Sequence, residues 1–331
     1  MRAVIGCSPE EAVAQLKQGN PVALPTETVY GLAAPLWDED AILKIYTLKQ
    51  RPLNNPFIVH VLDECQLDQV AYVNAQATKL INVFWPGPLT LILPKKPCVP
   101  LVVTAQQSSV AVRAPSSPLF RKVLELLGAP LVAPSANKFQ QVSPTCAQHV
   151  MHGMGDTLSY ILDGGPCPLG VESTILSLLN EQHPTLLRYG PIAKESIEDV
   201  LKQSVHIPLA DENDRPTKLC PGLFKKHYSP HIPLYLVDKL QGFKPPQHLE
   251  QQFHQRAAHV FFTRPRRILT GKEFYLTENE DLAEAAANLF ATLQHLDQCH
   301  FKSIWIETVP HKGIGYAIND RLNRAAHDRF P

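Results

Sequence analysis

The rest of the chain is organised around the stretch PTETVYGL, residues 25–32. It directly follows a short apolar run, 22–24, and contains hydroxyls, a carboxylate and a glycine. Such crowding of small polar side chains is typical of a ligand-facing loop after a buried strand. The stretch LKQRPLNNP, residues 48–56, follows one short helix later and places Lys49, Arg51 and two carboxamides beside prolines. A loop stiffened by proline loses little entropy on binding and is suited to holding phosphate oxygens. With the strand-like run 57–61 and its single His60, these pieces predict one site for a small anionic or zwitterionic ligand plus phosphates.

Each charged residue of this site also has a structural explanation. Lys49 and Arg51 near a helix C-terminus are favourable by roughly a few tenths of a kcal/mol without any function. Neighbouring carboxamides and the bidentate geometry of arginine favour phosphate binding instead. A lone strand histidine such as His60 is more often a core residue than a catalyst, and Glu27 is either a general base or a hydrogen-bonded structural carboxylate.

Two further arginines end apolar runs. Arg113 and Arg188 each follow a strand-like segment, so each is expected to be nearly buried. A buried arginine needs an anion, which is either an internal carboxylate or a ligand. Neither alternative is favoured by the sequence.

Composition excludes several classes of protein. The 331 residues suffice for two domains, and 44% hydrophobic with 19% charged residues is typical of a soluble globular chain. The 31 basic and 31 acidic residues balance, so there is no chain-wide attraction to nucleic acid or membrane. The 7 cysteines form no C-x-x-C pair and are expected to be reduced thiols, mostly filling the core. No apolar run approaches the length of a membrane span or a signal peptide, so a cytoplasmic protein is expected.

The order of elements predicts an α/β fold with two domains. Residues 1–206 are expected to form a twisted mixed sheet, with strands at 22–24, 57–62, 89–93, 109–113, 160–163 and 173–179. The expected helices include one that Ser8 caps and Pro9 begins, 38–48, 118–127 and a helix capped by Ser196. Residues 207–231 are expected to be a linker, polar at 211–216 but rich in aromatic and basic residues at 220–230, which suggests a lid. Residues 232–331 alternate strands and helices and predict a smaller parallel-sheet domain.

Common catalytic signatures are missing. No G-x-x-x-x-G-K-[ST] or strand-linked G-x-G-x-x-G occurs, so any ATP would bind without a P-loop. Ser135 and Ser173 lack a G-x-S-x-G context, and His149 with His152 has no third ligand nearby for a metal.

Ordered motifs along most of the chain resemble a known family, the YrdC-domain threonylcarbamoyl-AMP synthases in their long, two-domain form. Besides 25–32, 49–56 and His60, the motifs are SVAVR at 109–113, PSAN at 134–137, SPT at 143–145, EST at 172–174, LRYG at 187–190, PG with HYSP at 221–230, and GYAINDRL at 315–322. The resemblance implies a YrdC-like domain followed by a smaller Rossmann-like α/β domain. It also implies a nucleotidyltransferase that makes threonylcarbamoyl-AMP and pyrophosphate from L-threonine, bicarbonate and ATP, for the threonylcarbamoyladenosine modification of tRNA.

The resemblance assigns residues and partners as well. The threonine-binding residues would be Thr28, His60, Arg113 and Ser173. The ATP-binding residues would be Lys49, Arg51, Asn55, Ser109, Ser135, Asn137, Ser143, Arg188 and Tyr228, with Lys49 and Arg51 stabilising the phosphates and the transition state. Mg²⁺ would come with ATP and take no protein ligand. The product would pass to the tRNA threonylcarbamoyl-transferase machinery, with at most a weak contact to tRNA and none to membranes. Where the family has Ser-Gly after Ser-Ala-Asn, this chain has residues 138–141, and losing the glycine restricts the backbone there.

Two rival interpretations remain at this stage. A nucleic-acid-binding protein would line a basic groove with Lys49, Arg51, Lys95, Lys96, Lys225 and Lys226. A carbamoyltransferase of the hydrogenase-maturation type shares the YrdC domain, but the chain lacks an acylphosphatase-like segment and zinc-finger cysteines.

Overall fold

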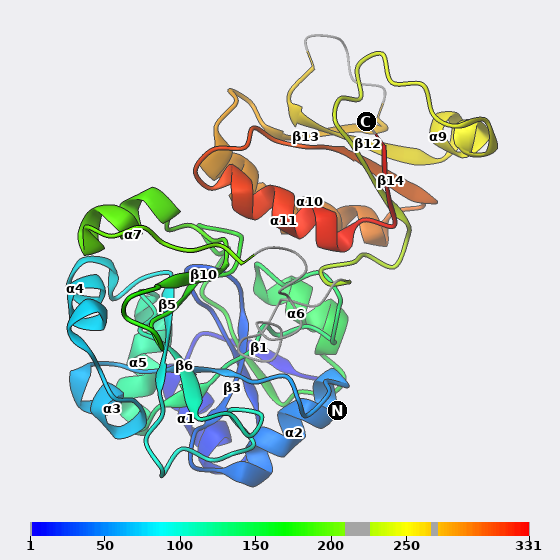
Figure 1. Ribbon diagram of the computed structural model, residues 1–331. Helices are drawn as coiled ribbons and strands as arrows, with labels where there is room; N and C mark the ends of the chain where they lie inside the picture. Colours follow the sequence, from blue (N-terminus) through cyan, green and yellow to red (C-terminus); the bar gives the residue numbers. More distant parts are fainter. Residues whose placement is uncertain (1, 209–225, 266–270, 331) are drawn as a thin grey trace.

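The computed structural model describes residues 2–208, 226–265 and 271–330, which form two α/β units (Figure 1). The polar stretch 211–216, Cys220 and Lys225 lie outside the described residues. Of the expected linker, the structure describes residues 207–208 and 226–231.

The first unit is built on a mixed sheet, as expected. Its order is β1-β8-β2-β3-β7-β4-β6-β5-β9-β10. Neighbours β1–β8, β8–β2, β4–β6 and β5–β9 run parallel, and the other neighbouring pairs run antiparallel. The strands are β1 (Val4–Gly6), β2 (Val22–Leu24), β3 (Gly31–Pro35), β4 (Ile58–His60), β5 (Leu89–Pro94), β6 (Ser109–Arg113), β7 (Leu131–Val132), β8 (Tyr160–Leu162), β9 (Thr174–Ser177) and β10 (Thr185–Arg188).

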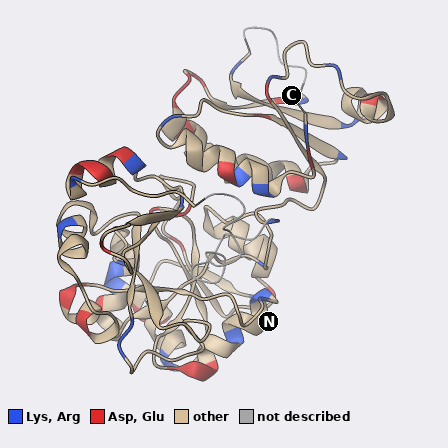
Figure 2. Ribbon diagram, viewed as in Figure 1, with Lys and Arg blue, Asp and Glu red and all other residues tan. Residues whose placement is uncertain are grey.

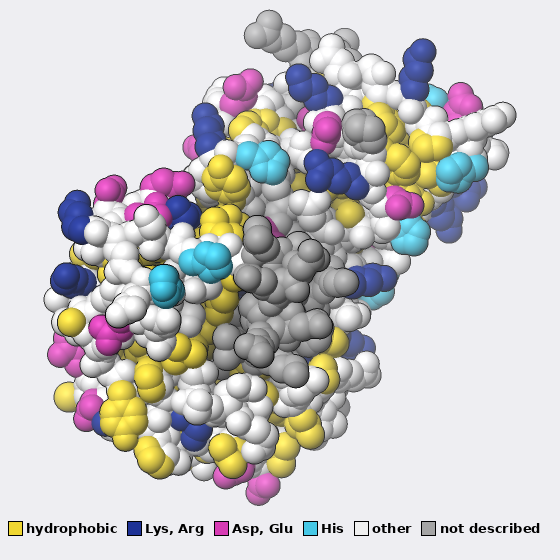
Figure 3. All heavy atoms as spheres, viewed as in Figure 1, with side chains coloured by type: hydrophobic (Ala, Val, Ile, Leu, Met, Phe, Trp, Pro, Cys, Tyr) yellow, Lys and Arg dark blue, Asp and Glu magenta, His cyan; other side chains and the backbone are white. Residues whose placement is uncertain are grey.

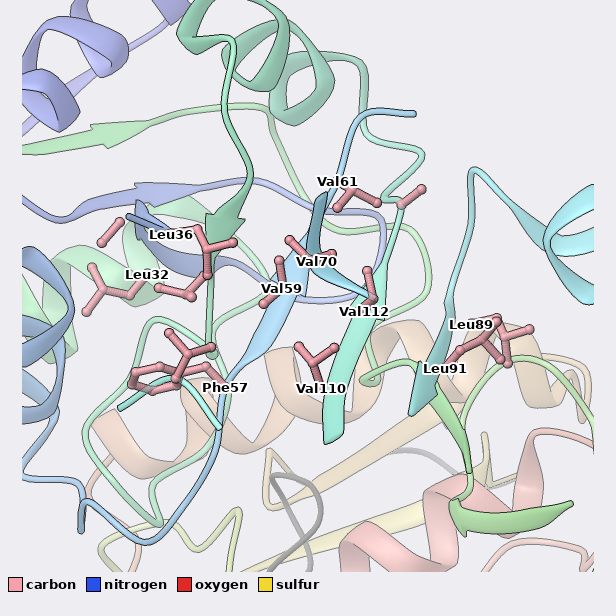
Figure 4. Packing of buried hydrophobic residues seen from close by; sticks show 14 of the residues in the cluster. Leu32, Leu36, Phe57, Val59, Val61, Val70, Leu89, Leu91, Val110 and Val112 are labelled. Atoms are coloured by element: carbon pink, nitrogen blue, oxygen red, sulfur yellow. The ribbon is translucent and has the colours of Figure 1, made fainter. Parts of the chain in front are cut away.

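Helices cover both faces of this sheet because its strands are apolar on both sides. Val22 and Leu24 belong to the apolar cluster that includes residues of α1 (Pro9–Lys17) and α5 (Pro118–Leu127). Ala23 between them belongs to a larger cluster, which includes residues of α2 (Glu39–Lys49), α4 (Ala75–Phe84) and α7 (Lys194–Leu201). Figure 4 shows Val59 on β4 and Val110 and Val112 on β6 within the second of these clusters. Helices α3 (Glu64–Val70) and α6 (Ala147–Met154) complete the unit.

One expected helix start is confirmed and another is wrong. The Ser8 hydroxyl accepts a hydrogen bond from the Glu11 N–H at 3.1 Å and caps α1. Ser196 does not cap α7, which begins at Lys194. The helix thus begins before the expected cap. An ion pair of 2.7 Å between Lys194 and Glu198, four residues apart on the same face, stabilises this first turn.

The second unit has an all-parallel sheet, also as expected. Its order is β13-β12-β14-β11-β15, and every neighbouring pair is parallel. The strands are β11 (Leu234–Val237), β12 (Ala257–Thr263), β13 (Glu273–Thr277), β14 (Ser303–Glu307) and β15 (Asp328–Phe330), of which β13 and β15 were not expected. Helices α10 (Leu282–Gln298) and α11 (Gly315–Ala325) lie between this sheet and the first unit, while the short η2 (Gln247–Leu249) and α9 (Glu250–Gln255) lie on its other side (Figure 1).

The cysteine expectation is wrong for most of the described cysteines. Cys167 is buried, but Cys7, Cys65 and Cys98 are exposed, because they lie in a loop or at a helix start rather than on an inward-facing strand position. All six described cysteines are free thiols. Among the described residues, no helix has both the length and the apolar character that crossing a bilayer requires.

Candidate functional site

The loop after β2 is folded by one threonine. The Thr26 hydroxyl donates to the Val29 carbonyl at 2.6 Å and accepts from the backbone N–H groups of Thr28 and Val29 at 3.0 and 3.1 Å. This tight hydroxyl-centred turn fixes the side chain of Thr28 beside that of Thr26, with 2.8 Å between their hydroxyl oxygens. The polar loop predicted from PTETVYGL is therefore real, and β3 begins within it at Gly31.

Arg113 ends β6 and connects this loop to the sheet. Its guanidinium donates to Thr28 Oγ1 at 3.0 Å and to the Gly87 carbonyl at 3.2 Å, and it lies 2.7 Å from Glu27 Oε1. The anion that this buried arginine needs is thus an internal carboxylate. Burial alone would raise the pKa of Glu27, but the charge and hydrogen bonding of Arg113 outweigh it and lower that pKa. Register pairs Arg113 with His60 on β4, which brings the histidine to the same edge.

Arg188 ends β10 and holds Ser173. Its Nε and Nη2 donate to the Ser173 carbonyl and hydroxyl, each at 3.0 Å, and the hydroxyl lies 2.7 Å from Thr90 Oγ1. Gly190 permits this approach, because a Cβ there would lie 2.2 Å from the backbone nitrogen of Thr174. The glycine of the LRYG motif therefore has a packing reason.

Lys49 and Arg51 are buried, so the explanation as solvated helix-end cations is wrong. The Lys49 ammonium donates to the carbonyls of Ser135 and Asn137, and Arg51 donates to those of Asn55 and Pro56 at 3.2 and 2.7 Å. Both side chains turn inward and satisfy buried loop carbonyls, of which that of Asn55 also accepts from the Tyr46 hydroxyl at 3.2 Å. Burial and then the neighbouring Arg51 hold the pKa of Lys49 well below its usual range, and burial lowers the pKa of Arg51 to about 10.

This burial also removes the rival basic groove. Lys49 and Arg51 cannot meet a nucleic acid at the surface, Lys96 pairs with Asp68 at 3.2 Å, and Lys95 donates to the Val99 carbonyl. Lys226 is exposed, and Lys225 lies outside the described residues. Figures 2 and 3 show Lys and Arg interspersed with Asp and Glu over the described surface in this view.

The stretch 138–141 forms its turn without the family's glycine. Gln140 takes a left-handed φ of 68°, and the Asn137 amide donates to the carbonyls of Lys138 and Gln141 at 2.7 and 2.9 Å. The Gln140 carbonyl accepts from Ser229 N–H at 2.9 Å. Side-chain and backbone hydrogen bonds thus support the conformation that glycine would adopt freely, and they tie this turn to the segment that carries Tyr228.

His227 and Tyr228 reach the site from the linker. The His227 N–H donates to the Arg324 carbonyl at 3.0 Å, and the Tyr228 ring lies stacked 5.5 Å from Phe290. Both residues are buried, and Tyr228 has a left-handed φ of 61°. Burial raises the pKa of Tyr228 to about 12.

These elements enclose one cavity of about 50 Å³. Eight predicted site residues line it, namely Thr28, Arg51, His60, Arg113, Ser135, Ser173, Arg188 and Tyr228. Five others lie outside the lining: Lys49, Asn55, Ser109, Asn137 and Ser143. Lys49 supports the lining through Ser135, and Ser143 through a 2.6 Å hydrogen bond to Glu172. Sequence reasoning did not assign Thr26, Glu172 or His227 to the site, although each belongs to a motif that it quoted.

Several buried polar atoms of the site have no hydrogen-bond partner among the described residues. They are Nδ1 of His60 and His227, the hydroxyl of Tyr228, the side-chain amide of Asn55 and Oδ1 of Asn137. Each such group costs about 1–3 kcal/mol if it stays unpaired, and those of His60, His227 and Tyr228 belong to residues that line the cavity, which indicates a place for a polar ligand there. Burial, assisted by Arg113, lowers the pKa of His60 to about 3, so its ring is neutral at physiological pH.

Positive charge converges on the same place. Burial and then Arg51, Lys49, Arg321 and Arg188 hold the pKa of His227 well below its usual range. The one carboxylate among the described lining residues is Glu172, which already pairs with Arg321 at 2.9 Å. The excess of cations suits an anionic ligand.

Fold and site together define a two-domain α/β protein with a buried, cation-rich pocket. Residues 14–190 match the family model described as telomere recombination, the Sua5, YciO and YrdC group. Residues 192–327 match the C-terminal domain of threonylcarbamoyl-AMP synthase. The chain belongs to the threonylcarbamoyl-AMP synthase family, in its two-domain form.

Named relatives match along almost the whole chain. The threonylcarbamoyl-AMP synthase of Bacillus subtilis is 39% identical over 327 residues, which cover 96% of this chain and 93% of the relative. That of Pyrococcus abyssi is 37% identical over 320 residues, with 95% and 93% covered. The crystal structure of P. abyssi Sua5 complexed with L-threonine superposes with a TM-score of 0.86 at 33% identity and covers 100% of this chain and 99% of that one.

Proposed function

We propose that this protein synthesises threonylcarbamoyl-AMP from L-threonine, ATP and bicarbonate or carbon dioxide, with release of pyrophosphate. The observation that carries the proposal is a single cavity lined at once by a hydroxyl and neutral-histidine group and by buried arginines. The relatives that bear this activity in their names match it over their full length.

The threonine end is the group Thr28, His60, Arg113 and Ser173. Arg113 already has a carboxylate partner in Glu27, and its fork of five donors leaves capacity for a second anion such as the threonine carboxylate. The unpaired Nδ1 of His60 offers a neutral partner to the amine or hydroxyl of the ligand. Selection of threonine over serine would then come from the small space around these groups.

The phosphate end is formed by Arg51, Arg188 and Tyr228, supported from behind by Lys49, Asn55, Ser109, Asn137 and Ser143. No group of three potential metal ligands occurs among the described residues. We propose that Mg²⁺ comes with ATP and would be held by phosphate oxygens and water, without a protein ligand. When bound, it would add positive charge on the triphosphate.

The reaction needs no nucleophilic side chain. The threonine amine, as the free base, takes up carbon dioxide with loss of a proton, or bicarbonate with loss of water, to form a carbamate. A carbamate oxygen then attacks the α-phosphorus of ATP while the bond to the β-phosphate breaks and pyrophosphate leaves. The protein's own contribution is to align the two reactants, which can supply roughly 7 kcal/mol or more, and to neutralise charge away from water. The carbamate is labile in water, so a closed cavity protects it.

We further propose that residues 1–206 form the catalytic domain, 207–231 a linker that acts as a lid, and 232–331 the C-terminal domain. The cavity is small beside the roughly 300 Å³ or more of a typical ligand site, so a lining segment must move to admit ATP. Tyr228 lies on the described part of the linker and lines the cavity. Tyr228→Ala should therefore raise unproductive hydrolysis of the product, and unchanged coupling between ATP use and product formation would refute the lid.

The product would be passed to the tRNA threonylcarbamoyl-transferase machinery, which suits the cytoplasmic location expected from the sequence. The decisive test is pyrophosphate release from ATP with threonine and bicarbonate each present or omitted. Release that requires both, and is much poorer with serine, supports the synthase. Release without threonine would indicate another acceptor, and no release would overturn the proposal.

A further inference from the structure

One buried arginine of the C-terminal domain reaches into the wall of the cavity. Arg321 on α11 is fully buried, and its Nε donates to Glu172 Oε2 at 2.9 Å across 149 residues of sequence. Its Nη2 donates to the Tyr189 carbonyl at 2.9 Å, and its Nη1 lies 2.7 Å from an Asp320 carboxylate oxygen. Burial alone would lower the pKa of Arg321, but Tyr228, Glu172 and Asp320 outweigh it and raise that pKa.

The side-chain contacts of Arg321 lead to Ser143, Arg188 and Tyr228 of the phosphate end, although Glu172 also directly precedes Ser173 of the threonine end. Glu172 accepts a 2.6 Å hydrogen bond from Ser143 through its other oxygen. The Tyr189 carbonyl belongs to the residue directly after Arg188. The Arg321 guanidinium also lies over the Tyr228 ring, 5.3 Å from its centroid. None of these contacts is made to Thr28 or His60.

Helix α11, which carries this arginine, and its neighbour α10 contact the first domain at other points as well. Gln294 on α10 donates to the Val142 carbonyl at 3.0 Å, next to Ser143. Gly170, with φ 69°, lies so close to α10 that a Cβ would be 2.4 Å from the Ala286 carbonyl oxygen. The Tyr316 ring on α11 stacks 5.4 Å from that of Tyr189. Arg321 is therefore held rigidly enough to determine where Glu172 lies.

We propose that Arg321 is a positioning residue through which the C-terminal domain fixes the ATP end of the cavity, and not the threonine end. Glu172, the Tyr189 carbonyl and Tyr228 meet at its guanidinium, and Glu172 links it to Ser143, so the second domain completes the nucleotide site. This inference rests on the proposed function and assigns the second domain a part in it.

The test compares full-length Arg321→Met and Arg321→Lys with a matched control, Arg329→Met. Arg329 lies on β15 of the same domain and makes an exposed 3.3 Å pair with Asp238. Hydrogen bonds to charged groups contribute about 1.5–3 kcal/mol, so Arg321→Met should raise KM for ATP by about tenfold or more. KM for threonine should stay within about twofold, and Arg321→Lys, which keeps the charge near Glu172, should recover part of the ATP affinity.

A general loss of folding would lower the active fraction and hence kcat, without moving KM for ATP alone. Equal rises of both KM values, or an unchanged KM for ATP in folded Arg321→Met, would overturn the inference. If Arg321→Met does not fold, Arg321→Lys decides, because it retains a cation beside Glu172; an unchanged KM for ATP there also refutes the proposal. A wild-type enzyme that releases no pyrophosphate would instead refute the proposed function itself.

Discussion

The two domains treat their buried polar groups differently. In the C-terminal domain, Asn319 pairs with both the N–H and the carbonyl of Val309 at 3.0 and 2.8 Å, and the Trp305 indole donates to Ser303 at 3.2 Å. In the catalytic domain, His60 and Asn55 are buried with unpaired side-chain atoms. An unpaired buried polar group destabilises a fold, so it persists where a ligand completes it. The difference indicates that the first domain is built to bind, and that most described polar groups inside the second hold its own structure.

The largest effect is expected at the buried ion pair of the catalytic domain. Arg113→Met would leave Glu27 as an uncompensated carboxylate, so the free energy of unfolding should fall by about 3–5 kcal/mol. The fall is measured by urea denaturation. Threonine-dependent pyrophosphate release should fall by about 100-fold or more, because a charge-assisted ligand contact is lost. Adding Glu27→Gln should restore much of the stability but not the activity. If the double variant regained activity, Arg113 would be a structural residue only, and the proposed difference between the two domains would not hold for it.

A change of similar size in the second domain should separate stability from binding. Trp305 is fully buried and stacks 4.5 Å from Tyr235 and 5.6 Å from Phe330. Trp305→Ala should destabilise the protein by about 3–5 kcal/mol, yet below the unfolding transition KM for threonine should change by less than about twofold. Urea denaturation and initial rates of the same preparation measure both quantities. A large rise in KM for threonine would show that the aromatic core of the second domain also shapes the threonine end.

Acid should weaken the first domain through His60. Its pKa is about 3 when folded and near the ordinary 6.5 when unfolded, so the unfolded state binds more protons between these values. Stability therefore rises with pH in this window and is lost as pH falls below about 6.5, by at most about 1.4 kcal/mol per pH unit. His149, with its pKa lowered by burial to about 4, acts in the same direction.

His60→Gln should reduce this pH dependence. Urea midpoints at about pH 7 and about pH 5 avoid most carboxyl titration, and the fall between them should be smaller in the variant than in the wild type. His248 lies on the short η2 of the second domain and is exposed, so His248→Gln is the matched control and should leave the fall unchanged. Equal falls in the wild type and His60→Gln would show that His60 does not titrate in this way.

The sequence predicted what depends on neighbours along the chain. Pro9 after Ser8 predicted the start of α1, and the loop at 25–32 was expected from its own residues. Pairings between distant segments could not be predicted, such as Arg113 with Thr28 across 85 residues or Arg321 with Glu172 across 149. Spacing carries no information on such contacts, because the sheet order brings them together.

The contacts of Lys49 could not be predicted for a related reason. A lysine in the last turn of a helix is also favourable when exposed, so sequence position alone does not give the direction of its side chain. The carbonyls that it contacts belong to Ser135 and Asn137, far along the chain. Its assignment to ATP stays a prediction, which its burial behind Ser135 leaves open.

The smallest effect is also the sharpest test of the comparison, because it removes one hydroxyl from each kind of setting. The Tyr228 hydroxyl is buried and has no hydrogen-bond partner among the described residues, whereas the Thr277 hydroxyl donates to Glu284 at 2.6 Å and accepts from the N–H groups of Asn279 and Asp281. Tyr228→Phe should therefore leave the urea midpoint unchanged or slightly higher, since no hydrogen bond of the free protein is lost. Thr277→Val should cost about 1–3 kcal/mol, because its partners are left unpaired.

For ATP affinity, we expect the larger effect in the variant that has the smaller effect on stability. Tyr228→Phe should weaken ATP several-fold, as the hydroxyl finds its partner only when the cavity is filled, and Thr277→Val should leave ATP affinity unchanged below its unfolding transition. Calorimetric titration of both folded variants measures this directly. A Tyr228→Phe protein that is clearly less stable without ligand, and equally tight for ATP, would mean that the hydroxyl has a structural partner and that unpaired atoms do not mark this site.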